Sequence, residues 1–185
     1  MTAFPGPQAA AWWHAMQPKH QAGQPSTGDR GALARLRRCS MVMDAASELA
    51  TLLLCRRLGV GEAGLERTAL LAAVLAQVRE NRTDLSVAKQ IGAAGGHAMS
   101  ELRFRRLLQA DTADEQLIGF RRLTALAGRK LNVADLAAGL WRWNDEAMRR
   151  HWIYAYYDAP EFSASTAQIE LPQTDPAPST EDTSA

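Results

Sequence analysis

The sequence predicts an all-α protein, a compact bundle of roughly eight short helices that form one unit or two packed sub-bundles. Alanine, leucine and arginine, which favour helices, dominate the 185 residues, whereas valine and isoleucine are sparse and alternating runs are lacking. Apolar residues recur instead every three or four positions along two stripes, Val42, Ala46, Leu49 and Leu53, and then Val133, Leu136, Leu140 and Trp143. Each stripe would face the core along one side of a helix.

The chain begins with a helix that carries Trp12 and Trp13 and should stop before Pro18. Adjacent residues point about 100° apart on a helix, so we expect only one tryptophan in the core and the other free for an interface. After a loop over residues 17–28, Asp29 is placed to cap a short basic helix.

A long helix is expected over residues 42–57, ending near Gly59. A glycine-containing piece then leads into residues 69–78, which are apolar almost all round and indicate a central buried helix. A second loose segment, residues 91–99, precedes Ser100, which opens the next helix.

Capping residues mark the helices of the C-terminal half. Thr112 and Glu115 have capping-box spacing for a helix that runs to about Ala127. Asn132 caps the helix with the second apolar stripe. Either the neighbouring Asn144 or Asp145 begins the last helix.

The charge distribution divides the chain at Tyr157. Six of the 20 acidic residues and none of the 21 basic residues lie beyond it, so the body carries 14 acids against 21 bases, a net charge of +7. Residues 158–185 are rich in proline, serine, threonine and acids, and hold too little apolar surface to offset the entropy of ordering. We therefore expect a helical nucleic-acid-binding domain over residues 1–157 and a disordered acidic tail over residues 158–185.

Composition excludes several classes of protein. Two cysteines, Cys39 and Cys55, cannot supply a disulfide framework or a four-cysteine zinc site. No apolar run approaches the ~18 residues that a membrane span needs, and the N-terminus lacks the pattern of a secretory signal. The expected location is the cytoplasm, with no membrane partner.

The residues offer little for catalysis. The four histidines show no HExxH spacing and have no cysteine pair nearby. Asp111 and Asp114 have a spacing that fits either a metal site or a helix N-terminus, and the second role is the commoner. Cys39 and Cys55 each border arginines that would lower a thiol pKa, although buried structural cysteine is more frequent. We expect no enzyme, no cofactor and no metal.

Arginine clusters carry the functional signal. Eighteen of the 21 basic residues are arginine, whose planar fork of donors grips phosphate at two points. The surplus of +7 cannot be paired within the body, which favours phosphate-backbone binding over mere solvation of helix surfaces. No basic helix carries an obvious set of base-reading side chains, so binding without sequence preference is expected. The tryptophans and tyrosines near the C-terminus could stack bases, but Trp143 and Trp152 continue apolar stripes and fit the core better.

Several segments in a fixed order resemble one family. They are residues 100–108 (Ser-Glu-Leu-Arg-Phe-Arg-Arg-Leu-Leu), residues 120–123 (Phe-Arg-Arg-Leu), the basic helix at residues 30–38, and the ending at residues 150–157. Together they resemble the small subunit (CasB) of the type I-E CRISPR surveillance complex Cascade. The resemblance spans about residues 12–157.

The resemblance implies an all-α, non-catalytic subunit in antiviral defence. Two copies would lie head-to-tail beside the Cascade backbone subunits, which hold the CRISPR guide RNA, with the large subunit as a further partner. They would stabilise the single strands of target DNA in the R-loop by contacting phosphates, while guide pairing reads the sequence.

Carried over by position, the family's basic residues fall on eight side chains: Arg37, Arg38, Lys89, Arg103, Arg105, Arg106, Arg121 and Arg122. Gln109 stands where some relatives have a basic residue, so that contact is either missing or supplied by Arg105. Two alternatives stay open, a stand-alone helix-turn-helix regulator of DNA and a structural adaptor for acidic proteins.

Overall fold

A computed structural model describes residues 5–18 and 28–158 of the chain. Over these residues it contains ten α-helices, two 3-10 helices and two strands of two residues each, so the all-α prediction is confirmed. The N-terminal group comprises α1 (Gly6–Met16), α2 (Arg30–Arg38), α3 (Val42–Ala46), α4 (Leu49–Leu58), η1 (Glu62–Gly64) and α5 (Leu65–Leu75). The C-terminal group comprises β1 (Glu80–Asn81), α6 (Val87–Ile91), η2 (Ala93–Gly95), α7 (Glu101–Leu108), α8 (Ala113–Leu126), β2 (Lys130–Leu131), α9 (Val133–Trp141) and α10 (Glu146–Tyr157).

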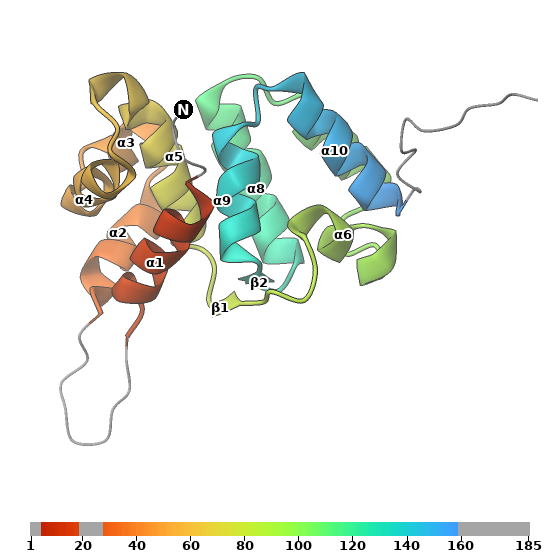
Figure 1. Cartoon of the computed structure of the whole chain (residues 1–185), viewed down its shortest axis with the longest axis horizontal. Helices are drawn as coiled ribbons and strands as arrows, with labels where there is room; N and C mark the ends of the chain where they lie inside the picture. The colour runs from red at the N-terminus through yellow and green to blue at the C-terminus, as the bar shows by residue number, and fades with distance from the viewer. Residues whose placement is uncertain (1–4, 19–27, 159–185) are drawn as a thin grey trace, which may run out of the picture.

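Helix α5 lies at the centre of the N-terminal group and joins it to the C-terminal group. Every residue from Thr68 to Leu75 is buried, as the all-round apolar stretch predicts. The helix packs against α3 and α4 on one side and against α8 and α9 on the other. Figure 1 shows α2, α3 and α4 toward one end of the long axis, α6 and α10 toward the other, and α8 and α9 between them. The buried side chains form one hydrophobic cluster that includes both groups.

A short parallel ladder lies within the C-terminal group and joins β1 to β2. Glu80 pairs with Lys130 and Asn81 with Leu131. The side chain of Asn81 also accepts a hydrogen bond from the backbone N–H of Val133 at 3.0 Å, which ties the start of α9 to β1.

The capping residues act where the sequence places them. The Asp29 carboxylate accepts the Ala32 N–H at 2.8 Å, and Asn132 and Asp145 cap α9 and α10 in the same manner. At α8, Thr112 and Glu115 form a reciprocal capping box. These contacts satisfy backbone donors that a helix start leaves unpaired.

The predicted long helix over residues 42–57 is wrong in one respect, because the chain turns at Ser47 and Glu48 and makes two helices, α3 and α4. The Thr51 hydroxyl donates to the Ala45 carbonyl at 2.6 Å across this turn, which fixes it. The turn also changes the buried face. Leu49 and Leu53 are 66% and 47% exposed, so the predicted stripe does not continue into α4.

The second predicted stripe is confirmed, since all four of its residues, Val133, Leu136, Leu140 and Trp143, are fully buried. Trp143 and Trp152 pack edge to face with ring centroids 5.0 Å apart, and both are core residues as expected. Trp12 and Trp13 are both buried, contrary to the expectation that one would be free. The indole N–H of Trp13 donates to the Val78 carbonyl at 3.3 Å, so its polar atom has a partner inside the fold.

Two further expectations concern the C-terminal boundary of the domain and membrane-spanning helices. Helix α10 ends at Tyr157, and the predicted tail beyond Asp158 lies outside the described residues. Among the described helices, none combines the length and the apolarity that crossing a membrane requires.

Candidate functional site

Helices α7 and α8 hold the candidate site because their packing turns arginines outward. On α7, Phe104 and Leu107 are buried, and Phe104 stacks on Tyr156 with ring centroids 4.0 Å apart. Arg103 and Arg106, one position before each, therefore stay exposed. On α8, Gly119 meets α7 so closely that an added Cβ would lie 2.7 Å from the Leu107 side chain.

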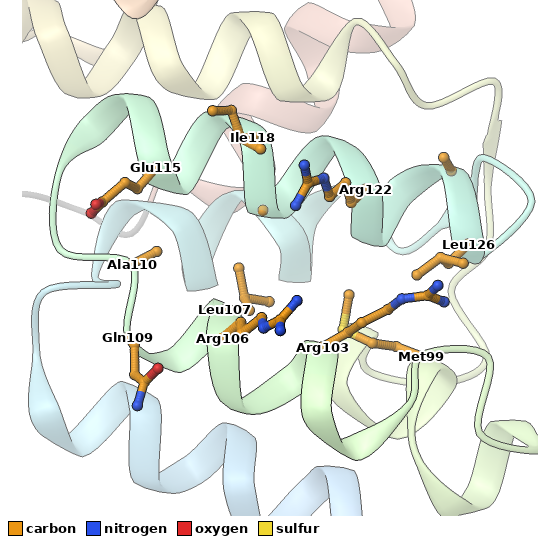
Figure 2. Close-up of a pocket in the computed structure, with 12 residues that line it drawn as sticks. Met99, Arg103, Arg106, Leu107, Gln109, Ala110, Glu115, Ile118, Arg122 and Leu126 are labelled. Carbon is orange, nitrogen blue, oxygen red and sulfur yellow. The ribbon is translucent and has the colours of Figure 1, made fainter.

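A groove of about 780 Å³ runs between the two helices. Apolar side chains line it from both sides, Met99 and Leu107 from the α7 side and Ile118 and Leu126 from α8. Figure 2 shows Arg103 and Arg106 of α7 in the space between the helices, with the Arg103 guanidinium directed toward Leu126, and Arg122 lying across α8.

The three groove arginines, Arg103, Arg106 and Arg122, are exposed and make no ion pair with any carboxylate of the described residues. Glu115 is the one carboxylate among the lining residues, and it accepts the backbone N–H groups of Asp111 and Thr112. The Thr112 amide and hydroxyl hold the pKa of Glu115 below its usual value. The groove therefore carries positive charge that its own acid does not neutralise.

Arg121 has an internal role, although it neighbours Arg122. Its guanidinium donates to the carbonyl of Leu36, in the last turn of α2, at 2.9 Å, and to the carbonyl of Cys39, the C-cap of that helix. Burial lowers the pKa of Arg121 from its usual value. Since a helix end leaves carbonyls without partners, Arg121 ties α8 to α2 and stabilises that end.

Arg37 is likewise half-buried, and its Nε donates to the Ala76 carbonyl at the end of α5 at 2.6 Å. Burial lowers its pKa, and the nearby charges of Arg79 and Arg129 lower it further. These three arginines form a second basic cluster. Sequence spacing did not group them, because they are distant along the chain and only the packing of α2, α5 and β2 brings them together.

The remaining predicted residues lie apart from the groove arginines. Arg105 pairs with Glu101, one turn earlier on α7, and Lys89 pairs with Asp158 at 3.5 Å. Arg38 is exposed and has no ion pair with a described carboxylate. The structure thus brings together three of the eight predicted side chains.

The residues considered for other chemistry have structural partners. The Asp114 carboxylate accepts the Val42 N–H at 2.7 Å, and Asp111 pairs with Arg149 at 2.8 Å. Burial raises the pKa of the Cys39 thiol, the opposite of an activated nucleophile. In residues 5–18 and 28–158, no group of three or more His, Cys, Asp and Glu side chains is arranged to hold a metal ion.

Comparison with known proteins identifies the class and then the family. The family model of CRISPR-associated protein Cse2 matches residues 32–157, more than half of the chain, which places it among the CRISPR-associated proteins. The chain belongs to the Cse2 family, the small subunit of type I-E Cascade, and the resemblance seen in the sequence is confirmed.

A solved structure shares the fold. A chain in the crystal structure of E. coli Cascade bound to a PAM-containing dsDNA target is 21% identical and superposes with a TM-score of 0.59. The match covers 80% of this chain and 93% of that one. A search of curated proteins found no match.

Proposed function

We propose that this Cascade subunit is non-catalytic and stabilises the R-loop by holding the sugar-phosphate backbone of target DNA. The observation that carries the proposal is the groove between α7 and α8, where Arg103, Arg106 and Arg122 are exposed without a carboxylate partner among the described residues. Guanidinium groups bind phosphate through paired donors, and each contact releases condensed counterions from the nucleic acid.

The eight predicted residues divide into two roles under this proposal. Arg103, Arg106 and Arg122 contact phosphate directly, and the exposed Arg38 adds a contact elsewhere. Arg121 and Arg37 act as positioning residues, because their guanidinium groups already serve backbone carbonyls of the fold. Arg105 and Lys89 are available for nucleic acid once their exposed ion pairs, which contribute little to stability, are exchanged for phosphate.

The energetic case rests on the near balance of R-loop formation. The RNA–DNA heteroduplex is about as stable as the DNA duplex that it replaces, so modest protein contacts to the strands decide the outcome. A charge-assisted hydrogen bond contributes about 1.5–3 kcal/mol at most, and three of them are enough to shift such a balance. In this scheme the guide RNA reads the sequence and the subunit supplies affinity alone.

The family and the matched E. coli chain, which lies in a Cascade complex bound to a double-stranded DNA target, support the choice of partners. We propose that the chain assembles in the cytoplasm with the Cascade backbone and large subunits, the guide RNA and a second copy of itself. Co-expression with those subunits and a guide RNA tests the assembly. Purification of the chain apart from an otherwise complete complex would contradict it.

A matched pair of variants tests the groove. The substitutions Arg103→Ala, Arg106→Ala and Arg122→Ala remove three positive charges from the groove. The control removes the same charge from three exposed arginines elsewhere that also lack ion pairs with described carboxylates, Arg30→Ala, Arg56→Ala and Arg57→Ala.

The readouts are the lifetime of R-loops on assembled Cascade and the affinity of the isolated chain for single-stranded DNA at several salt concentrations. The groove variant should shorten the R-loop lifetime. It should also make the negative slope of log K against log salt shallower by about 2, since each lost phosphate contact removes about 0.7 from its magnitude. The control variant should retain most of the R-loop lifetime and most of the salt dependence of wild type. Equal losses in the two variants would show that overall charge, and not the groove, drives binding.

A further inference from the structure

The groove has an apolar floor that phosphate binding does not require. Met99 and Leu107 form its buried part, and Ile118 and Leu126 of α8 remain 48% and 36% exposed along it. Exposed apolar side chains gathered in a hollow indicate a binding site. A surface that only tracked a phosphate chain would need the guanidinium groups but not this floor.

Polar and apolar groups alternate along α8 where it faces the groove. Ile118, Arg122 and Leu126 follow each other at intervals of four residues, so they lie on one side of the helix, about 6 Å apart along its axis. Each apolar side chain thus stands one turn from the guanidinium of Arg122. Nucleic acid has the same alternation when it is single-stranded, with charged phosphates joined to flat apolar bases.

We infer that the groove between α7 and α8 takes neighbouring unpaired nucleobases of one strand, one against Ile118 and one against Leu126, while Arg103, Arg106 and Arg122 hold the flanking phosphates. The inference rests on the proposed function and names the ligand as a single strand with its bases turned toward the protein. A volume of about 780 Å³ lies within the range of small-molecule sites and leaves room for the bases.

The arginines also serve the base, because a guanidinium plane stacks on an aromatic ring. Gln109, an exposed lining residue at one end of the groove, offers an amide that can donate to and accept from a base edge. A base that is paired and stacked in a duplex cannot enter. Under this inference the groove favours separated strands over duplex, a preference that backbone binding alone would not produce.

The test compares a short labelled oligothymidylate with the same sugar-phosphate chain made abasic, using the full-length protein. Both probes carry the same phosphates, so only a base site distinguishes them. We expect the intact strand to bind about fivefold more tightly than the abasic one, the gain for burying a small part of the base surface.

A floor variant, Ile118→Gln with Leu126→Gln, should bring the affinity for the intact strand to within about twofold of that for the abasic strand. Its affinity for the abasic strand should not change, because the three arginines remain. The matched control is Leu52→Gln with Leu53→Gln, two leucines of α4 with similar exposure outside the groove, and it should behave as wild type. The single change Ile118→Gln repeats the test if the double variant does not fold.

Several results would overturn the inference. Equal affinity of the unaltered chain for intact and abasic strands, with both weakened by salt, would reduce the groove to a phosphate site and leave the proposed function in place. If polyglutamate displaced the intact and the abasic strand from the protein equally well, the groove would be a site for any acidic polymer. A change of oligomeric state in the floor variant would identify an interface between copies. Absence of any salt-dependent binding would overturn the proposed function itself.

Discussion

Two neighbouring arginines of α8 should respond in opposite ways to the same substitution. Arg121→Ala removes the two hydrogen bonds to the carbonyls of Leu36 and Cys39 at the end of α2. Arg122→Ala removes an exposed side chain that lines the groove and has no ion pair with a described carboxylate. We expect the first change to lower stability and the second to lower nucleic-acid affinity.

The magnitude follows from the contacts. A hydrogen bond that involves a charged group contributes about 1.5–3 kcal/mol when it is shielded from solvent. Because Arg121 is only half-buried, we expect its two bonds together to contribute about 2–3 kcal/mol. For a chain of this length, that loss of unfolding free energy lowers the Tm by about 5–10 °C. Arg122→Ala should stay within about 0.5 kcal/mol of wild type in stability and weaken binding of single-stranded DNA about three- to tenfold.

Thermal unfolding followed by circular dichroism, and fluorescence anisotropy with a labelled single strand at about 25 °C, measure the two effects. Arg121→Lys serves as a control for charge, because an ammonium cannot offer the fork that reaches both carbonyls, and it should recover little stability. An unchanged Tm for Arg121→Ala, together with a loss of DNA affinity, would refute the assignment of Arg121 as a positioning residue.

Two further predictions concern stability. Gly139→Ala places a Cβ 2.7 Å from the Trp152 ring and should lower the free energy of unfolding, measured by chemical denaturation, by about 1–3 kcal/mol. The control Gly61→Ala, whose Cβ would have nothing within 4 Å, should lower it by about 0.5 kcal/mol or less. Equal losses in the two variants would contradict the close packing of α9 on α10. The pKa of Glu115 is lower in the folded protein than in the unfolded chain, so the stability it adds through its carboxylate is present above the unfolded value and lost as pH falls through the folded one. The Tm difference between wild type and Glu115→Gln should therefore shrink as melts move from about pH 7 to about pH 2, and a difference independent of pH would argue against a charged cap.

Helix ends were predictable because they depend on local chemistry. A capping residue and the amide that it satisfies lie two or three positions apart, as for Asp29 and Ala32 or Asp145 and Ala147. The apolar stripe from Val133 to Trp143 was equally predictable from the sequence. It lies on α9 and on the turn after that helix, and all of its residues face the core. The family resemblance also rested on such short strings of residues.

Burial of a face was less predictable where the chain turns. The spacing from Val42 to Leu53 is correct for one continuous helix, but the turn at Ser47 redirects α4 so that Ala50 and Leu54 are buried instead. Both Trp12 and Trp13 are buried for a related reason. Helix α1 packs against α9, far along the chain, so its neighbours cannot be inferred from its own sequence.

The sequence by itself determined that the chain is helical, where most of its helices begin, and that its body carries surplus arginine. Only the tertiary structure decided what each arginine does. The partners of Arg121 lie 82 and 85 residues away along the chain, and Arg122, one position on, faces a groove that exists only because α7 packs beside α8. Local chemistry places a side chain on a helix, whereas the contact that gives it a role depends on which distant segment packs against that helix.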